Sequence, residues 1–377
     1  MKYCIKCLQA DTRPNTYFNE HGICPACTYF AKLVEVDWNA RNAKLLELAD
    51  EYRNPSAQYD CIIGVSGGKD SYRQALWVRD YLKLRPLLVC VSYPPHQLTH
   101  VGVYNVSSLI ESGFDVIQIS PAPETWRKLM RLGFENYANW ARSTELALFS
   151  GVPKIAIDYK IPLILWGENP GLQLGDLKTL GKSGYDGNNL RNMNTLSGGN
   201  FQWMLDAGFL EKDLIPYHYP TIEEFEASNI QIVYLGWFLG DWSLLNNGAI
   251  SALSGIKIRD DTAMNTGDLY GVTSLDEDWV TLNQMIKYFK FGFGRASDYV
   301  NEMIRLGKID RSEGITLINK YDGRCSDEYI KTFCEFIDIS VDDFWNKVVS
   351  VTNKDLFDVS MAPNITRKFV VGKGLDK

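Results

Sequence analysis

The sequence predicts an α/β protein built on a doubly wound parallel sheet, with a small four-cysteine knuckle before the sheet and a helical region after it. Short apolar runs alternate with segments of helical periodicity, which is the pattern of strands joined by helical crossovers. Two Cys-x-x-Cys pairs precede this pattern, and from about Trp279 to near Phe357 the periodicity is helical only. We therefore expect a knuckle at residues 1–40, an α/β domain at 41–240, and a mainly helical region for substrate or partner at 241–377.

The N-terminal cysteines form the pairs Cys4-x-x-Cys7 and Cys24-x-x-Cys27, with sixteen residues between the pairs. This spacing is typical of a tetrahedral zinc site in which each pair donates two thiolates. A redox pair or two disulfides are the alternatives, but both require the spacing to be a coincidence. Four thiolates leave no position for substrate, so we expect a structural site that stabilises a segment with little core of its own. His21 is a further possible ligand that four cysteines make unnecessary.

The strands of the α/β domain are expected where apolar runs are short and rich in β-branched residues. The run at 61–65 is typical of a strand buried on both faces, and apolar residues at helical spacing from Tyr72 to Leu82 predict a helix after it. In such sheets ligands bind beyond the carboxyl ends of the strands. The other expected elements are a helix at 37–53, the strand RPLLVCVSYP, a helix at Thr99–Ser112, the strand FDVIQISP, a helical zone at about 124–159, the strand IPLILWGEN, and the strand IQIVYLGWF near 231–238.

The turn SGGKDS between the first strand and its helix is suited to holding phosphates. Gly67 and Gly68 carry no Cβ, so the backbone can bend sharply and an anion can approach the N–H groups at the start of the helix. The other members supply two hydroxyl donors, a cation, and a carboxylate for magnesium or for capping the helix: Ser66, Ser71, Lys69 and Asp70. An ordinary strand–turn–helix with a Ser or Asp cap is the alternative. The spacing fits neither the Walker loop nor G-x-G-x-x-G.

Three charged residues farther along the chain are candidates for the same site. Glu168 ends an expected strand, where it could bind magnesium or be a solvated carboxylate. Lys290 and Arg295 flank a glycine-containing turn, where they could balance the α-phosphate, hold a sugar diphosphate, or be two solvated charges. Residues 167–200 are rich in Gly and Asn and lack periodicity, which predicts a functional loop suited to a ligand with hydroxyl and amide groups, such as a sugar.

Composition narrows the class of protein. The formal charge of −7 argues against nucleic acid as the main partner. No apolar run approaches a membrane span, and the N-terminal Met-Lys-Tyr-Cys does not begin a signal peptide. Eight cysteines without an export signal indicate metal ligands or free thiols rather than disulfides, so we expect a cytoplasmic protein.

Two family resemblances follow from these motifs. SGGKDS resembles the PP-loop of the N-type ATP pyrophosphatases, the superfamily of asparagine, GMP and NAD synthetases and of tRNA thiolases. This implies an adenine nucleotide alpha hydrolase-like fold at 41–240, cleavage between the α- and β-phosphates of ATP, and transfer of AMP to an acceptor oxygen. Over nearly its full length the chain also resembles the N-acetyl sugar amidotransferase family of the WbpG and PseA type, which acts in O-antigen and pseudaminic acid biosynthesis. The segments that carry this resemblance are YCIKCLQADTRPNTYFNEHGICPAC, GVSGGKDS, THVGVYNVSSLIESGFDV, WGEN, and KFGFGRASD with IRLGKI and YDG after it.

The second resemblance implies an enzyme that consumes ATP and ammonia and converts the acetamido group of a nucleotide-activated sugar into an acetamidino group. It implies Zn²⁺ at the four cysteines, ATP at residues 66–71, and Mg²⁺ as a further cofactor, with Glu168 as a tentative ligand. Lys69, Asp70, Lys290 and Arg295 are the implied catalytic residues.

Ammonia must come from elsewhere, because most of it is protonated at neutral pH and the sequence offers no glutaminase nucleophile among its cysteines and four histidines. We expect a separate partner, and the resemblance points to a pair similar to the histidine-pathway glutaminase and cyclase subunits. Three rival functions stay open: amidation of a uronic acid carboxylate, tRNA thiolation, and a nucleotide-binding scaffold without activity. A thiolase would be expected to carry further cysteine pairs and a basic face.

Overall fold

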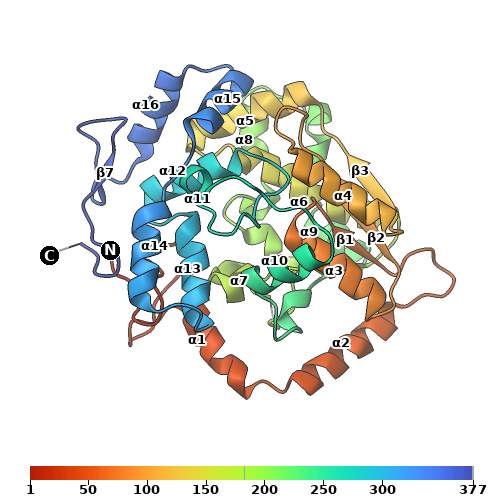
Figure 1. Ribbon diagram of the computed structural model, residues 1–377. Coiled ribbons are helices and arrows are strands. Elements are labelled where there is room, and N and C mark those ends of the chain that lie inside the picture. Colours follow the sequence, from red (N-terminus) through yellow and green to blue (C-terminus); the bar gives the residue numbers. More distant parts are fainter. Residues whose placement is uncertain (182, 376–377) are drawn as a thin grey trace.

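Figure 1 shows the chain as a computed structural model that describes residues 1–181 and 183–375. Lys182, in the expected 167–200 loop, and residues 376–377, at the end of the expected C-terminal region, lie outside the described residues. At the centre is a five-stranded parallel sheet in the order β3-β2-β1-β4-β5. The chain winds outward from β1 to β3 and returns beside β1 with β4. The doubly wound sheet is therefore confirmed, with its switch point between β1 and β4. The strands are β1 (Cys61–Gly64), β2 (Pro86–Val91), β3 (Val116–Ile119), β4 (Leu163–Trp166) and β5 (Gln231–Tyr234), and a separate antiparallel pair consists of β6 (Phe357–Asp358) and β7 (Thr366–Arg367).

Helices follow the strands as the periodicity predicts, with two differences of detail. The helical zone at about 124–159 is two helices, because Ala138 adopts a left-handed conformation with φ of 45°. The strand expected near 231–238 ends at Tyr234, because Leu235–Trp237 forms a 3-10 turn. The helices of the described residues are α1 (Pro25–Lys32), α2 (Trp38–Tyr52), α3 (Lys69–Asp80), α4 (His100–Glu111), α5 (Pro123–Tyr137), α6 (Ala141–Asp158), α7 (Pro170–Gln173), α8 (Gln202–Asp206), α9 (Ile222–Ala227), α10 (Leu244–Leu253), α11 (Ala263–Thr266), α12 (Val280–Phe291), α13 (Arg295–Arg305), α14 (Arg311–Tyr321), α15 (Asp327–Ile337) and α16 (Val341–Val351).

Both faces of the sheet are covered, because successive strand residues point into two different apolar layers. In β1, Ile62 belongs to the layer that includes Trp126 of α5 and Val152 of α6. Ile63 belongs to the opposite layer, which includes Ala75 of α3. The strands β1, β2 and β4 are therefore buried on both faces, whereas β3, at one edge of the sheet, is only partly buried.

The helical C-terminal region shares the first of these layers with the sheet. Phe134 of α5 stacks on Phe344 of α16 with ring centroids 5.3 Å apart and meets Phe333 of α15 edge-on at 5.5 Å. Residues of α12 and α13 belong to the same apolar layer, and the residues of α13 that line a cavity with the Ser66–Ser71 loop place this helix near the carboxyl ends of the strands. Among the described helices, none combines the length and apolarity needed to cross a bilayer.

Candidate functional site

The loop Ser66–Ser71 connects the end of β1 to α3 at the switch point of the sheet. Gly67 has φ of +88°, a conformation that L-residues avoid, and a Cβ at this position would lie 2.6 Å from the carbonyl oxygen of Gly102 in α4. Gly68 is the N-cap residue of α3, and no side chain of the described residues caps this helix. The N–H groups and the positive dipole end of α3 are therefore available to a phosphate.

The charged residues of the loop are held by α10. Lys69 is only 6% exposed and pairs with Asp70, with 2.6 Å between Nζ and Oδ2. Asn247 of α10 donates its amide to Oδ1 of Asp70, also at 2.6 Å. Asp70 does not cap α3, and because it lines a cavity at the loop its carboxylate could serve as an oxygen ligand for magnesium.

Two cavities meet at this loop. The first, of about 230 Å³, lies beyond the ends of β1 and β4, and its mainly apolar walls include Val65 and Trp166. The second, of about 360 Å³, extends from the loop to α13, and charged residues of both signs line it: the cations are Lys69, Arg295 and Arg305, and the carboxylates include Asp70, Glu168, Asp276 and Glu302. An apolar pocket beside one that offers cations for phosphates and carboxylates for a divalent ion is suited to a nucleotide base and its metal-bound phosphates.

Glu168, at the end of β4, lines both of these cavities and a third. Burial and the charge of Asp70 raise the pKa of Glu168, and Lys69 opposes this shift. Its side chain is solvent-accessible because it borders the cavities. A divalent cation would favour the ionised form of such a carboxylate, so the residue fits its predicted role as a magnesium ligand.

Asp276 is a carboxylate at the same loop that the sequence analysis did not single out. It lines both cavities, and burial raises its pKa, with the Ser66 hydroxyl opposing the shift. The backbone N–H of Thr99 donates to the Asp276 carbonyl oxygen at 3.1 Å, which ties this segment to the start of α4. Asp276 stands far from the loop in sequence, in a short acidic stretch without periodicity, so no local signal identifies it.

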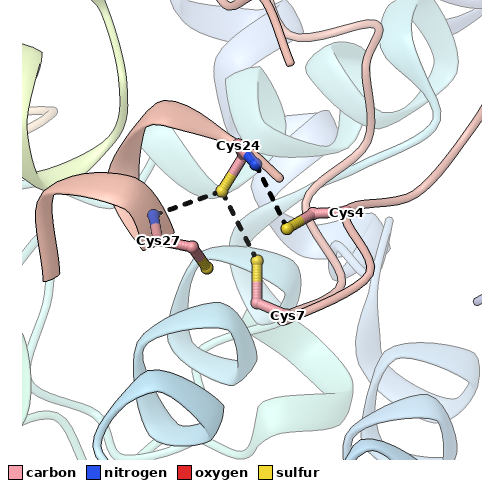
Figure 2. A group of neighbouring side chains, drawn as sticks. All are labelled: Cys4, Cys7, Cys24 and Cys27. Carbon is pink, nitrogen blue, oxygen red and sulfur yellow. Dashed lines mark hydrogen bonds between the residues drawn. The ribbon is translucent and has the colours of Figure 1, made fainter. Parts of the chain in front are cut away.

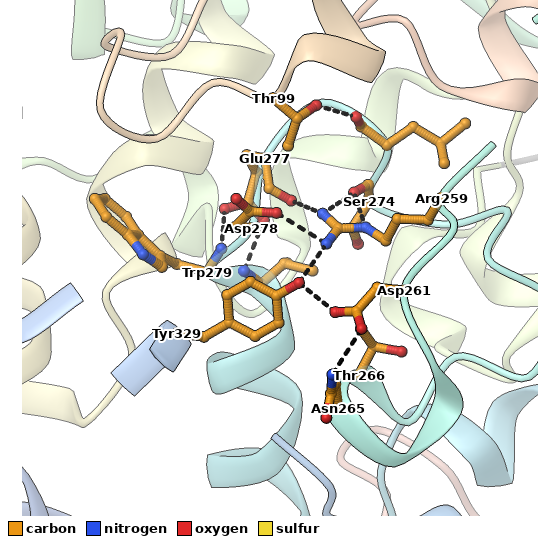
Figure 3. Close-up of polar contacts among 12 residues, drawn as sticks. Thr99, Arg259, Asp261, Asn265, Thr266, Ser274, Glu277, Asp278, Trp279 and Tyr329 are labelled. Carbon is orange, nitrogen blue, oxygen red and sulfur yellow. Dashed lines mark hydrogen bonds and ion pairs between the residues drawn. The ribbon is translucent and has the colours of Figure 1, made fainter. Parts of the chain in front are cut away.

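The segment that carries Asp276 is fixed by a buried guanidinium, shown in Figure 3. Arg259 donates to the carbonyl oxygens of Ser274, at 2.8 Å, and Glu277, at 2.7 Å. It also pairs with Asp278 at 2.8 Å, and its side chain is 8% exposed. Since Ser274 and Glu277 bracket Asp276, Arg259 positions the carboxylate at the loop.

Lys290 and Arg295, five positions apart in sequence, line different cavities. Arg295 begins α13 and lines the second cavity, at the loop. Lys290 lies in the last turn of α12, donates to the carbonyl oxygens of Tyr137 (2.6 Å) and Ala138 (3.0 Å), and lines the third cavity. Gly292, with φ of +78°, ends α12 between them and turns the chain. Burial lowers the pKa of Lys290 to about 8. Only Arg295 is placed to meet a phosphate at the loop.

The four N-terminal cysteines come together as expected (Figure 2). Their ligand atoms all lie within 4.8 Å of one another, and all four residues are buried. The Sγ atoms of Cys7 and Cys24 are 3.7 Å apart, close to the edge of a tetrahedron whose metal–sulfur bonds are about 2.3 Å. Sulfur atoms at this spacing could all reach one central ion, so the cluster can bind a metal. His21 is exposed and lies outside the set.

The N-terminal cysteine knuckle packs against the C-terminal helical region. Arg311 of α14 donates to the carbonyl oxygens of Cys4 and Cys7, and the N–H of Leu8 donates to the side chain of Asn301 in α13 at 2.8 Å. A metal in the cluster would therefore stabilise the surface against which α13 packs, and α13 supplies Arg295 and Arg305 to the second cavity.

A glycine-bent SGGKDS loop at the switch point of a parallel sheet defines an α/β protein of the PP-loop class. Residues 270–369 match the family described as "LPS biosynthesis protein WbpG-like, C-terminal domain". This match to the C-terminal part of the chain confirms the resemblance to the WbpG type. The matched region contributes Asp276, Lys290 and Arg295 to the cavities.

The other comparisons add little. No curated protein matches the chain. Among solved structures, the U34-tRNA thiolase NcsA from Methanococcus maripaludis with its 4Fe-4S cluster is 13% identical, with a TM-score of 0.30 over 89% of this chain and 95% of that chain. A similarity at this level carries no inference about the chemistry of the present protein.

Proposed function

We propose that the protein is an ATP-dependent, AMP-forming amidotransferase that converts the acetamido group of a nucleotide-activated N-acetyl sugar into an acetamidino group, for bacterial O-antigen or lipopolysaccharide biosynthesis in the cytoplasm. One observation carries the proposal. Asp276, from the WbpG-like region, lies at the phosphate loop and lines the same two cavities as Asp70. The family match supports a sugar-modifying enzyme, and the loop supports the use of ATP.

In this proposal the adenine of ATP occupies the apolar cavity and the phosphates lie against the loop. The backbone N–H groups at Gly67 and Gly68 hold the β,γ-pyrophosphate, and Lys69 and Arg295 balance its charge. Because the loop is anchored through the Asp70–Asn247 contact, these groups need little rearrangement when pyrophosphate leaves.

The chemistry has two steps. The acetamido oxygen attacks the α-phosphorus of ATP, a P–O bond forms, and the bond to pyrophosphate breaks. The former amide oxygen is now part of AMP, which is a good leaving group. Ammonia then adds to the carbon of the acetamido group. AMP departs with the oxygen, and loss of a proton gives the amidine. The contribution of the protein is positioning and charge stabilisation.

Two metal ions fit the residues present. Asp70, Glu168 and Asp276 would hold Mg²⁺, which neutralises charge on the phosphates when bound. The four cysteines would hold Zn²⁺ in a closed, structural site.

A separate glutaminase, similar to the histidine-pathway glutaminase and cyclase pair, would supply the ammonia. Burial raises the pKa of the thiols of Cys61, Cys90, Cys325 and Cys334, so they are protonated at neutral pH and poor nucleophiles. The other four cysteines form the metal cluster. The part of the chain that the structure describes therefore offers no activated thiol to hydrolyse glutamine.

The test is incubation of the purified protein with ATP, ammonium and a panel of nucleotide sugars that carry acetamido groups. AMP and pyrophosphate should form only when a sugar is present, and ADP as the product would exclude the mechanism. Mass spectrometry should find NH in place of the acetamido oxygen. Nitrogen on a uronic acid carboxylate would show the rival amidation, and transfer of sulfur to tRNA would show thiolation.

A further inference from the structure

The third cavity, of about 330 Å³, adjoins the nucleotide cavity. Phe149 of α6 and Trp166 of β4 line both cavities, and their rings stack with centroids 5.1 Å apart. Glu168 also lines both. A ligand in the third cavity would therefore lie beside a nucleotide in the first, with the aromatic pair and Glu168 at the boundary.

This cavity contains polar atoms that the protein itself does not satisfy. Four of the residues that line it carry a buried side-chain atom that makes no full hydrogen bond to the described residues: Arg13 Nε, Glu145 Oε2, Thr195 Oγ1 and Gln284 Oε1. The Thr195 hydroxyl lies near the Glu145 carboxyl and opposes the rise in its pKa that burial causes. Buried polar groups in folded proteins are almost always paired, so polar groups of this kind around one cavity favour a bound polar molecule.

The types of these groups define the ligand. The guanidinium of Arg13 donates, while the hydroxyl of Thr195 both donates and accepts. The carboxylate of Glu145 accepts, and the amide of Gln284 can do either, depending on its rotation. Sugar hydroxyls and an acetamido group need such a mixture, and a 330 Å³ cavity is within the size range of small-ligand pockets. Apolar walls, including Phe291, suit the apolar face of a sugar ring.

The charged side chains of the third cavity indicate a second property of its ligand, an anionic group. Arg13 and Lys287 share the single carboxylate of Asp298, which compensates one of their two positive charges. Lys290 contacts only carbonyl oxygens, and no ion pair to it occurs within the described residues. Lys290 can therefore meet an anionic substituent such as a phosphate in this cavity.

We propose that this cavity binds the N-acetylated sugar of the acceptor, with Glu145, Thr195 and Gln284 recognising its acetamido and hydroxyl groups and Lys290 binding its attached phosphate. The assignment rests on the proposed function, and it names the acceptor site that the sequence alone did not define. It places the acetamido oxygen on the Glu168 side of the cavity, next to the nucleotide.

Calorimetric titration of the full-length protein tests the proposal. The probes are UDP-N-acetylglucosamine, UDP-N-acetylglucosaminuronic acid and CMP-N-acetylneuraminic acid, with UDP-glucose as the sugar that lacks an acetamido group. At least one acetamido probe should bind, and it should bind roughly tenfold more tightly than UDP-glucose. Thr195→Val and Glu145→Gln should each weaken that binding roughly tenfold, whereas the affinity for a non-hydrolysable ATP analogue should not change.

Matched controls are available on the surface. Thr316 on α14 and Glu135 on α5 are exposed, so Thr316→Val and Glu135→Gln should leave sugar binding unchanged. Hydrogen exchange gives the location independently: the sugar should protect residues 190–195 and α12, and the ATP analogue should protect residues 66–71.

Other results of these experiments would contradict either the acceptor-site assignment or the proposed function. If no acetamido probe binds, or if the bound sugar protects only residues 66–71, the assignment is wrong. It is also wrong if the two variants raise the KM for ammonium alone, because the cavity would then be a passage for ammonia. If AMP forms but the variants leave the KM for the sugar unchanged, the acceptor assignment fails while the proposed function stands. If no AMP forms but a sugar protects residues 190–195, the proposed function fails while the cavity assignment stands.

Discussion

Replacing Gly67 with alanine tests whether the phosphate loop is held against α4 as the structure shows. The φ of +88° costs an L-residue about 1–2 kcal/mol. The added Cβ would lie 2.6 Å from the Gly102 carbonyl oxygen and 3.3 Å from the Asn105 Cβ, and overpacking of this kind costs about 1–3 kcal/mol. Gly102 has no room to move away, because it packs directly against the backbone of Asp276. The contact is so close that a Cβ built on Gly102 would lie only 2.5 Å from the Asp276 Cα. Gly67→Ala should therefore lower the free energy of unfolding by about 2–5 kcal/mol.

Two other glycines provide matched controls. Gly113 has φ of +92°, but an added Cβ there would have no neighbouring atom within 4 Å, so Gly113→Ala should cost only the conformational part, about 1–2 kcal/mol. Gly68 has φ of −80°, and the atom nearest to an added Cβ would be Ser66 Oγ at 3.5 Å. Gly68→Ala should be neutral, or should stabilise the protein by about 0.4–1 kcal/mol through the unfolded chain.

The assay combines urea unfolding, followed by tryptophan fluorescence, with AMP release under native conditions. Gly67→Ala should lose stability and activity, and Gly113→Ala should lose stability alone. Gly68→Ala should keep its stability and lose activity, because the methyl group stands where a phosphate approaches the backbone. Equal stability of Gly67→Ala and Gly113→Ala would refute the packing argument, and normal turnover of Gly68→Ala would refute the phosphate site.

The remaining predictions concern the metal cluster, the carboxylate segment and the third cavity. Cys27→Ser should abolish zinc binding, measured by elemental analysis, and should lower the Tm, since the knuckle supports α13; a metal-free protein with an unchanged Tm would contradict this. Asp276→Asn should lower turnover at least about tenfold without changing the free energy of unfolding, because its backbone contact with Thr99 is kept; unchanged turnover would exclude Asp276 from the site. Arg259→Ala should cost at least about 2 kcal/mol in urea unfolding, because it removes charged hydrogen bonds to two carbonyl groups, and turnover should fall with it; wild-type stability would show that the segment is fixed by other contacts. Sugar binding, measured by calorimetry, should weaken as the pH rises through about 8, because the ammonium of Lys290 loses its proton there, and Lys290→Arg should remove this dependence; a flat wild-type profile would exclude the contact.

The parts of the site that are contiguous in sequence could be predicted from it. The phosphate loop depends on one strand, two glycines and one helix start, and all of these lie within residues 61–82. The cysteine pairs likewise specify a tetrahedral cluster by spacing, and their sulfur atoms meet as expected. Strand burial on both faces follows from the β-branched runs, because a parallel sheet needs apolar residues on both sides.

The parts that depend on long-range packing could not be predicted in the same way. Asp276 reaches the loop because the Arg259 guanidinium holds the carbonyl groups on either side of it, and such contacts have no periodicity. Lys290 and Arg295 are close in sequence, but a left-handed glycine turn directs them to different cavities. The expected 167–200 loop was identified by its composition, but its composition does not show which of its residues, among them Pro170, Leu174 and Thr195, line a cavity.

One continuous segment connects the two halves of the proposed reaction. Asp276 lies at the phosphate loop, α12 begins four residues later, and Gln284 and Lys290 on that helix line the third cavity. A rigid helix therefore relates the position of the nucleotide to that of the acceptor, which is what transfer of adenylate to one particular oxygen requires. The same segment belongs to the WbpG-like region rather than to the sheet. In the proposed reaction, the sheet and its loop bind ATP and activate it for transfer of adenylate to an acceptor, and the C-terminal region selects that acceptor. Changes in α12 should therefore alter which sugar is used before they alter the affinity for ATP.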